Sequence, residues 1–316
     1  MNEQWKILMD TSPTATWFQS EEAYNCFVSC TSWLEPYLVQ VHRGERLVGS
    51  LLGYVTKERC RIKQFFTARA VVFGGPLLAE DITDDELTQL LQLAIAHQPS
   101  AIYTEIRNFH DYSRWRSVFE QVGWTYVPHY DIHISCRDKE TMMAHIHESK
   151  MRAIRKAQTQ GETWAEATNE EQLKQWYKQL RHLYKTKIHR PLWPLNFFLH
   201  LWKQGYAKLL IIVSKSDALP ASERGGIFCV KDGRSLYEWY ICGSTMVTFG
   251  ALEYANEQGL TRFDLMGAGE PNVPYGVRDF KMQFGGELKE IGRYQIIGKP
   301  LLYRLGKAFI SFTSHL

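Results

Sequence analysis

The order of the predicted secondary-structure elements occurs twice along this chain, and the repeat limits the fold more than any other feature. In each half, apolar patterning predicts strand, strand, helix, strand, helix and strand in that order, with one additional strand before them in the first half. The main elements are expected at residues 37–42, 47–56, 65–73, 84–97, 101–106, 112–121 and 124–135, and again at 226–230, 236–242, 246–258, 261–265, 276–284 and 287–297. The halves share little identity, so the repeat is one of topology. We therefore expect an α/β (α+β) protein with two modules, each built on a mixed sheet.

Length and composition agree with two folded domains. A chain of 316 residues with 45% hydrophobic and 13% aromatic residues can fill two cores, which excludes global disorder. Lys and Arg number 37 against 34 Asp and Glu, a net charge of only +3. We therefore expect no binding of duplex DNA, and any site for a polyanion must be a local cluster.

Cysteine, histidine and glycine spacing predicts neither a metal nor a cofactor. The six cysteines are scattered without a Cys-x-x-Cys pair, which favours reduced thiols in the core. The histidine pairs His145/His147 and His129/His133 show no acidic or cysteine partner at metal spacing. No dinucleotide loop, Gly-x-Ser-x-Gly elbow or acetyl-CoA loop is visible. Because the N-terminus lacks an apolar signal segment, we expect a cytoplasmic protein.

A glycine-rich loop, a short helix and an extended segment follow one another near the C-terminus. The loop covers residues 267–276, and on the helix Val277, Phe280 and Phe284 are spaced to form one apolar stripe against a core. Arg278 and Lys281, three residues apart, are predicted on a neighbouring face. Two cations beside such a loop suit a polyanion or a developing oxyanion. The alternative is a solvated helix face above a packed stripe.

The same stretch carries a resemblance to a known family. Arg278-Asp-Phe-Lys-Met-Gln-Phe-Gly-Gly-Glu287 resembles the Phe-Lys-x-x-Phe-Gly signature of the Fem family (FemAB/FemX type), transferases that move amino acids from aminoacyl-tRNA onto peptidoglycan precursors. Four further segments resemble a Fem-like subgroup of Bacteroidetes type, namely residues 107–112, 149–156, 237–243 and 263–269. The resemblance covers most of the chain.

The resemblance implies a fold and an activity. Fem proteins contain two tandem GNAT-like (acyl-CoA N-acyltransferase-like) domains, and this chain has no heptad run for the helical arm of some members. The implied donor is aminoacyl-tRNA, and the implied acceptor is a peptidoglycan or other cell-envelope precursor. In one departure from its relatives, residues 242–246 connect a strand directly to a helix where the relatives have a longer, aromatic-bearing segment.

By resemblance Lys281, with Phe280 beside it, is the residue expected to stabilise the negative charge of the transition state. Arg278 is expected to share that role or to hold a phosphate. Glu238 and Asp264 are the candidate general bases. Glu238 alternates along a strand so that it shares one face with Tyr240 and could point into a cleft, and Asp264 ends the next strand. The alternative is that an acid at a strand end caps a loop and that a tyrosine only packs. Two tyrosines are candidates for substrate contact, Tyr240 on the strand of Glu238 and Tyr275 in the loop.

A second basic group lies between the two modules. In the segment that begins at Lys150, Arg152, Arg155 and Lys156 are spaced i, i+3 and i+4 and form a basic face that would grip phosphates of the substrate. A solvated helix face explains the same pattern. The tail, residues 299–316, is predicted as a basic amphipathic helix that either contacts a membrane carrying lipid-linked precursors or packs on its own domain.

The sequence thus predicts three segments and one leading function. Residues 1–137 and 138–298 are expected to form the two GNAT-like domains, and residues 299–316 a C-terminal helix. The leading function is transfer of an aminoacyl group from aminoacyl-tRNA to an amine of an envelope precursor. The alternatives are an acyl-CoA-dependent N-acyltransferase acting on a nucleotide sugar and a non-catalytic module that binds glycans or nucleotides.

Overall fold

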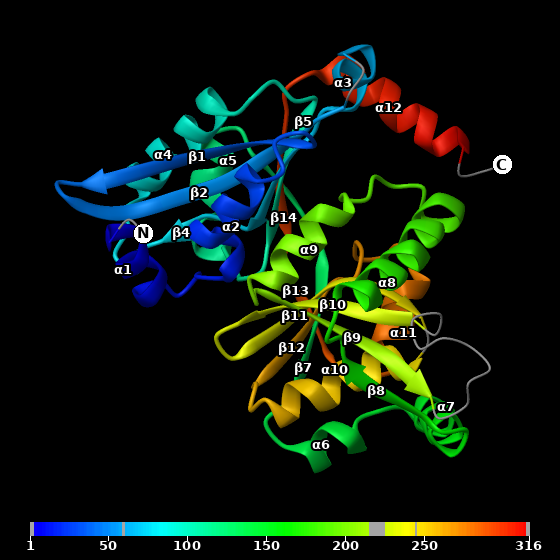
Figure 1. The fold of residues 1–316 in the computed structure, drawn as a ribbon. Helices are drawn as coiled ribbons and strands as arrows, with labels where there is room; N and C mark the ends of the chain where they lie inside the picture. The colour runs from blue at the N-terminus through cyan, green and yellow to red at the C-terminus, as the bar shows by residue number, and fades with distance from the viewer. Residues whose placement is uncertain (1–2, 59–60, 215–224, 244, 314–316) are drawn as a thin grey trace. The chain divides into compact units, whose positions relative to one another are not determined.

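The computed structural model describes residues 3–58, 61–214, 225–243 and 245–313, without the side chains of 63 and 307–313. The chain forms two compact units (Figure 1). Unit 1 is discontinuous and comprises residues 1–128 and 291–316, whereas unit 2 is the continuous segment 129–290. Each unit has its own sheet and its own apolar core. The prediction of an α/β protein with two mixed sheets is confirmed.

Unit 1 is built on a sheet with seven strands among the described residues, in the order β1-β2-β3-β5-β14-β6, with β4 paired to β2. β3 and β5 are parallel and the other paired strands are antiparallel. The strands are β1 (Leu34–Arg43), β2 (Arg46–Thr56), β3 (Ala70–Gly74), β4 (Leu77–Leu78), β5 (Tyr103–Asn108), β6 (Thr125–Val127) and β14 (Arg293–Ile297).

Helix α4 (Asp84–His97) shows why the residues of unit 1 fold as they do. A capping box between Thr83 and Glu86 begins α4, and Leu87, Leu90 and Leu91 pack at helical spacing into the core. The helices are α1 (Glu3–Thr11), α2 (Glu21–Val28), α3 (Arg61–Thr67), α4 (Asp84–His97), α5 (Arg116–Gln121) and α12 (Pro300–Thr313), with short 3₁₀ turns at Trp17–Gln19 and Ser113–Trp115.

The sheet of unit 2 also has seven described strands, in the order β13-β7-β12-β11-β10-β9-β8. Among the described strands of this sheet, β11 and β12 pair in parallel and the other pairs are antiparallel. The strands are β7 (Tyr130–Ser135), β8 (Glu162–Glu166), β9 (Ala207–Ser214), β10 (Gly225–Asp232), β11 (Ser235–Gly243), β12 (Arg262–Gly267) and β13 (Glu287–Glu290).

One helix of unit 2 is buried on nearly all sides. α10 carries apolar and small residues all round, such as Val247, Ala251 and Leu252, and it packs in the core of this unit. The helices are α6 (Lys139–Ala144), α7 (Glu148–Thr159), α8 (Glu170–Leu183), α9 (Leu195–Lys203), α10 (Thr245–Glu257) and α11 (Gly276–Met282), and one π turn covers Tyr184–Ile188. None of the described helices combines the length and apolar character needed to cross a bilayer.

Two predicted strands prove to be pairs of strands that belong to different sheets. Residues 124–135 divide into β6 of unit 1 and β7 of unit 2, and residues 287–297 divide into β13 of unit 2 and β14 of unit 1. At the second division Gly292 has φ +71°, where a residue with a Cβ is strained. Periodicity cannot reveal such a division, because the partner strand of each half is set by tertiary contacts.

The observed units therefore differ from the expected boundaries after residues 137 and 298. β7 pairs with β12 and β13, so it belongs with the second unit, and β14 pairs with β5 and β6 of the first. A third difference concerns residues 65–73, where α3 covers the first part and β3 begins at Ala70.

Five cysteines are buried and free, and Cys60 lies outside the described residues.

Candidate active site in unit 2

Lys281 lies inside unit 2 rather than on its surface. The residue is 8% exposed, and its ammonium donates hydrogen bonds to the carbonyl oxygens of Leu265 and Gly267, the latter over 3.4 Å. The same Nζ lies 3.1 Å from Oε1 of Glu238. Because an ammonium has three donors, all three are engaged. The expectation that this lysine emerges with Arg278 on an accessible helix face is wrong.

The orientation of α11 explains the burial. Lys281 is four residues after Val277 and three before Phe284, so its spacing places it within the predicted apolar stripe. Phe284 is buried and Phe280 is half-buried beside it, with 5.4 Å between the ring centroids. Val277 is instead 44% exposed, because it lies in the first turn of a helix with only seven residues. The stripe is thus formed by Phe280, Lys281 and Phe284.

The last glycines of the signature fix this helix against the sheet. Gly285 has φ +83°, and a Cβ there would lie 2.6 Å from the main-chain oxygen of His145. A Cβ at Gly286 would overlap the side chain of Ile132 on β7. Both positions therefore require glycine, since a larger residue would collide with His145 at the first position and with β7 at the second.

Glu238 is buried on β11, beside an irregularity in the strand. The pairing between β10 and β11 moves from Phe228↔Tyr240 to Cys229↔Glu238, which leaves Trp239 as an extra residue. This bulge interrupts the alternation that the sequence predicts. Glu238 pairs with Lys281, whereas Tyr240 packs its ring 5.0 Å from that of Phe198. Burial raises the pKa of Glu238, the ammonium of Lys281 opposes the rise, and Asp264 adds to it.

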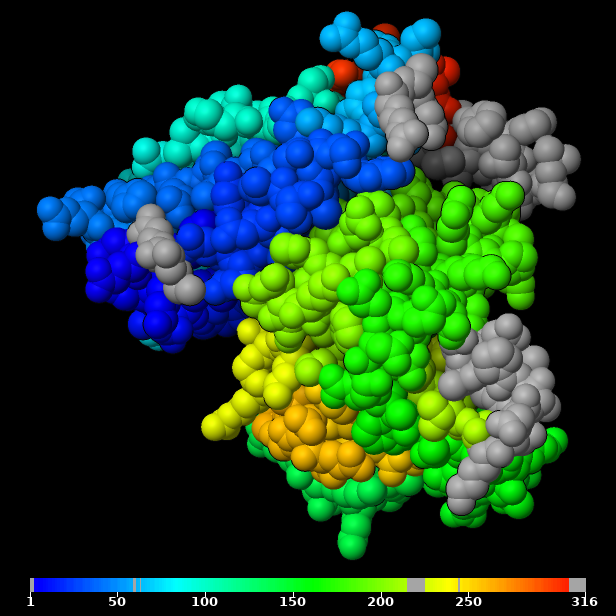
Figure 2. Space-filling model, in the orientation of Figure 1, coloured from blue at the N-terminus to red at the C-terminus, as the bar shows by residue number. Residues whose placement is uncertain are grey.

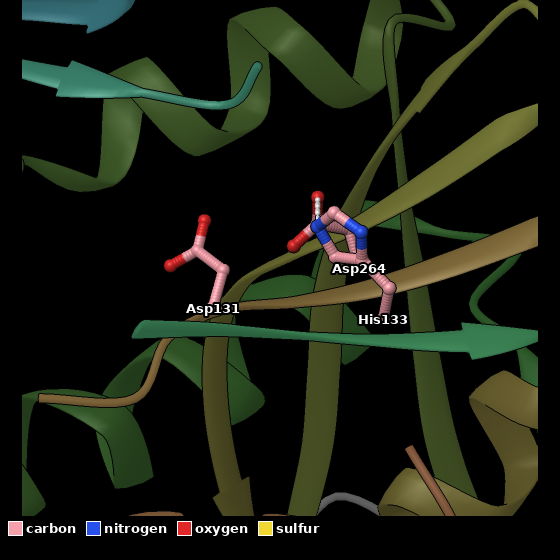
Figure 3. A group of neighbouring side chains, drawn as sticks. All are labelled: Asp131, His133 and Asp264. Atoms are coloured by element: carbon pink, nitrogen blue, oxygen red, sulfur yellow. Dashed lines mark ion pairs between the residues drawn. The ribbon is translucent and has the colours of Figure 1, made fainter. Parts of the chain in front are cut away.

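Asp264 lies on the neighbouring strand and is completely buried. Its Oδ1 accepts a hydrogen bond from the N–H of Met266 at 2.8 Å, and Met266 has φ +55°, which is uncommon for a residue with a side chain. Asp264 Oδ2 lies 3.1 Å from Nε2 of His133 on β7 (Figure 3). In the sheet, Asp264 on β12 lies opposite Tyr237 of β11 on one side and opposite His133 of β7 on the other. β12 thus lies between the strand of Glu238 and the strand of His133.

Asp131 joins this group, which sequence reasoning missed. One possible ligand atom each from Asp131, His133 and Asp264 lies within 4.8 Å of the others (Figure 3). Two carboxylates and an imidazole are a donor set that divalent cations accept. The histidine pair that includes His133 showed no acidic partner by spacing, yet Asp131 is two residues away on the same strand and Asp264 comes from the next strand. The alternation Asp-x-His was the available signal.

Arg278 holds the glycine-rich loop in place. Its guanidinium donates hydrogen bonds to the carbonyl oxygens of Glu270 at 2.9 Å and Val273 at 2.6 Å. Tyr275 is more than a third exposed, and its ring lies so close to Gly269 that a Cβ there would be 2.8 Å from it. Arg278 therefore organises main-chain atoms of residues 268–273. Tyr275 is the more accessible of the two candidate tyrosines.

The basic helix α7 divides between two places. Its N-terminal end contacts α11, where the N–H of His147 donates to the carbonyl of Gln283 at 2.8 Å, and Lys150 Nζ lies 3.9 Å from the ring centroid of Phe280. Burial lowers the pKa of Lys150. Arg152 and Arg155 instead line a hollow of about 630 Å³ together with Met143, Ala144, Ile146, Glu148 and Met151. Lys156 is exposed, and neither it nor Lys281 lines that hollow.

Comparison with known proteins identifies the fold. No family model matches the chain, and no curated protein matches it in sequence. Among solved structures, FemX matches with a TM-score of 0.67 and 13% identity, covering 96% of this chain and 98% of FemX. The fold is the tandem GNAT-like fold of FemX.

Two further solved structures match over most of the chain. L-PGS from Bacillus licheniformis matches with a TM-score of 0.55 and 12% identity over 84% of each chain. The C-terminal domain of a putative lysylphosphatidylglycerol synthetase from Agrobacterium fabrum matches with a TM-score of 0.59 and 11% identity, covering 98% of this chain and 95% of that domain. At these identities the likeness shows the fold alone. The fold expected from the Fem resemblance is confirmed, without a helical arm, since the longest described helices have 14 residues.

Proposed function

We propose that this protein transfers an aminoacyl group from aminoacyl-tRNA to an amine of a cell-wall or cell-envelope precursor. The observation that carries the proposal is the Lys281–Glu238 ion pair inside unit 2, 3.1 Å between charged atoms. Moving two charges out of water costs several kcal/mol per ion, and apolar side chains of similar volume would stabilise the fold as well or better. Such groups gather at functional sites. The FemX-like fold supports the reaction class.

The chemistry needs charge stabilisation more than it needs a strong nucleophile. The acceptor amine attacks the ester carbonyl of the aminoacyl-tRNA, a C–N bond forms, and the carbonyl oxygen becomes an oxyanion. The C–O bond to the ribose then breaks, and the proton lost by the amine passes to the leaving ribose oxygen. An ammonium fixed close to the oxyanion lowers the barrier, and removal of one such contact typically costs about 3 kcal/mol.

Lys281 supplies that ammonium in the proposal. Its contact with the carbonyl oxygen of Gly267 is long, 3.4 Å, so this partner is the one that a substrate oxyanion replaces at least cost. Glu238 and the other carbonyl contact keep the ammonium charged and oriented. Phe280 packs beside it and, through Lys150, links α11 to α7.

Glu238 is the proposed proton acceptor. Its raised pKa makes it a better base than an ordinary glutamate, and Asp264 helps to maintain that rise. Tyr275 and the loop organised by Arg278 are proposed to contact the substrate, together with Tyr240. The cations Lys150, Arg152, Arg155 and Lys156 are proposed to bind phosphates of the nucleotide-linked or tRNA-linked substrate.

The test is a transfer assay with a mixed pool of charged tRNAs and envelope precursors, read by mass spectrometry of the acceptors. We expect an acceptor to gain the mass of one amino-acid residue. Lys281→Met should abolish the gain, whereas Lys289→Met removes an exposed lysine of β13 and serves as the matched control. Transfer from an acyl-CoA with no response to charged tRNA, or full activity of Lys281→Met, would contradict the proposal.

A further inference from the structure

Two helices of unit 1 expose large apolar side chains to solvent. Ile62, Phe65 and Phe66 of α3 and Leu301 and Leu305 of α12 are each more than half exposed. We call these five residues the α3–α12 surface. The helices are neighbours at one end of unit 1, with α3 in light blue and α12 in red (Figure 1). Figure 2 shows the light-blue side chains of α3 at this end, with a small red part of α12 behind them. Lys299, just before α12, places its Nζ 4.8 Å from the ring centroid of Phe65.

The charged residues within the two segments that carry this surface are all basic. Residues 61–67 and 299–313 contain five cations and no aspartate or glutamate, the cations being Arg61, Lys63, Lys299, Arg304 and Lys307. The whole chain carries only +3. The five positive charges of these two segments therefore exceed the net charge of the whole protein.

This combination of side chains decides between possible occupants. A second copy of the chain would bring one positive surface against another, and like charges oppose association. Helices with bulky apolar side chains and flanking Lys and Arg are typical of proteins that lie in the headgroup region of anionic bilayers. Aromatic residues such as Phe65 and Phe66 add apolar area at that boundary.

We propose that the α3–α12 surface docks on the anionic face of a lipid bilayer. The apolar side chains enter the boundary between headgroups and acyl chains, and the cations pair with anionic headgroups. Docking goes beyond the proposed transfer reaction and does not depend on it, because it uses only residues of unit 1. Each cation near such a surface strengthens binding by about fivefold at low salt.

The experiment is flotation of the full chain with lipid vesicles. We expect binding to vesicles of phosphatidylcholine with phosphatidylglycerol, weaker binding to phosphatidylcholine alone, and a decrease at high salt, since salt screens exposed charges. The Arg61→Gln/Arg304→Gln variant should bind anionic vesicles roughly tenfold more weakly or worse.

Two matched double variants separate docking from a general loss of apolar surface. Leu301→Ser/Leu305→Ser should weaken vesicle binding by at least about tenfold, because both side chains lose their apolar burial. Ile7→Ser/Val28→Ser removes two exposed apolar side chains elsewhere in unit 1 and should leave binding unchanged. All four positions are exposed, so circular dichroism melts should match the parent protein.

Three results would overturn the proposal. One is a parent protein that does not float with anionic vesicles. Another is equal binding by Leu301→Ser/Leu305→Ser and the parent. The third is a parent protein that is dimeric by analytical ultracentrifugation and does not bind vesicles, together with a monomeric Leu301→Ser/Leu305→Ser variant. That result would assign the surface to a second copy of the chain. Aminoacyl transfer is measured with a water-soluble acceptor in parallel, so failure of docking and failure of the proposed function are distinguishable.

Discussion

Two groups of this protein pair basic with acidic side chains in opposite surroundings. In unit 1, Arg43 lies 2.8 Å from Asp81 and 2.7 Å from Glu86, and Arg46 lies 2.8 Å from Asp81, all at the surface. In unit 2, Lys281 and Glu238 are 3.1 Å apart and almost completely buried. The distances are alike, but the cost of desolvation is not.

The pKa values report this difference directly. Hydrogen bonds from Arg46 and Arg43 lower the pKa of Asp81 to about 2, and a hydrogen bond from Arg43 lowers that of Glu86 to about 2. Burial raises the pKa of Glu238 even though a lysine adjoins it. At the surface, pairing favours the charged form of the acid, whereas in the interior burial outweighs pairing. The interior pair thus contributes little to stability, and for this reason we propose a role for it in catalysis.

Removal of the interior cation should have the largest effect. In Lys281→Met, Glu238 remains buried without its partner, so we expect a loss of about 3–5 kcal/mol in the free energy of unfolding, together with loss of transfer. An exposed position would have tolerated the change, but this one is buried. Urea denaturation measures the first effect and the transfer assay the second. Stability equal to that of Lys289→Met would contradict the cost assigned to burial.

A double variant should recover much of that loss. Lys281→Met combined with Glu238→Gln leaves no uncompensated charge at the pair, so it should be more stable than Lys281→Met alone by at least about 1 kcal/mol. Transfer should stay absent, because both proposed catalytic groups are gone. Additive losses in the double-mutant cycle would show that the pair is not coupled.

A smaller and pH-dependent effect is expected from Glu238 itself. Because its folded pKa is raised above 4.5, the folded state binds the proton more tightly, so this group's contribution to stability falls as pH rises from 4.5 through the folded pKa. Glu238→Gln should remove that decline in urea titrations at a series of pH values. In the parent protein, kcat/KM should fall as pH drops through the same raised pKa. An acid limb at 4.5 or below would argue against Glu238 as the base.

The surface group should give the smallest effect. Arg46→Ala removes one exposed ion pair, so Tm should change by no more than about 2 °C. The change should shrink at high salt, because the charges are screened there. Scanning calorimetry at two salt concentrations measures both quantities. A large and salt-independent shift would show that the surface group is as costly to disturb as the interior pair.

The sequence predicted the fold because periodicity and resemblance act over many residues. The α/β class, the mixed sheets and the FemX-like fold followed from runs of apolar residues and from segments spread along the chain. The division of residues 124–135 and 287–297 between two sheets was not predictable, because pairing partners are set by tertiary contacts.

The site was predicted less completely. Lys281 and Glu238 were named separately, and the structure brings them together because β11 and α11 meet in unit 2. The burial of Lys281 was missed, since a charged residue is rarely assigned to the core even when its spacing fits. The predicted face shared by Glu238 and Tyr240 was interrupted by a bulge, which has no simple sequence pattern.

The position of β14 has a consequence for how the protein is made. This strand lies between β5 and β6 in the sheet of unit 1, yet it follows the whole of unit 2 along the chain. During translation, residues 129–290 emerge before that strand does, so the later-made unit obtains all of its strands first. The half of the protein that leaves the ribosome earliest is the last to be completed.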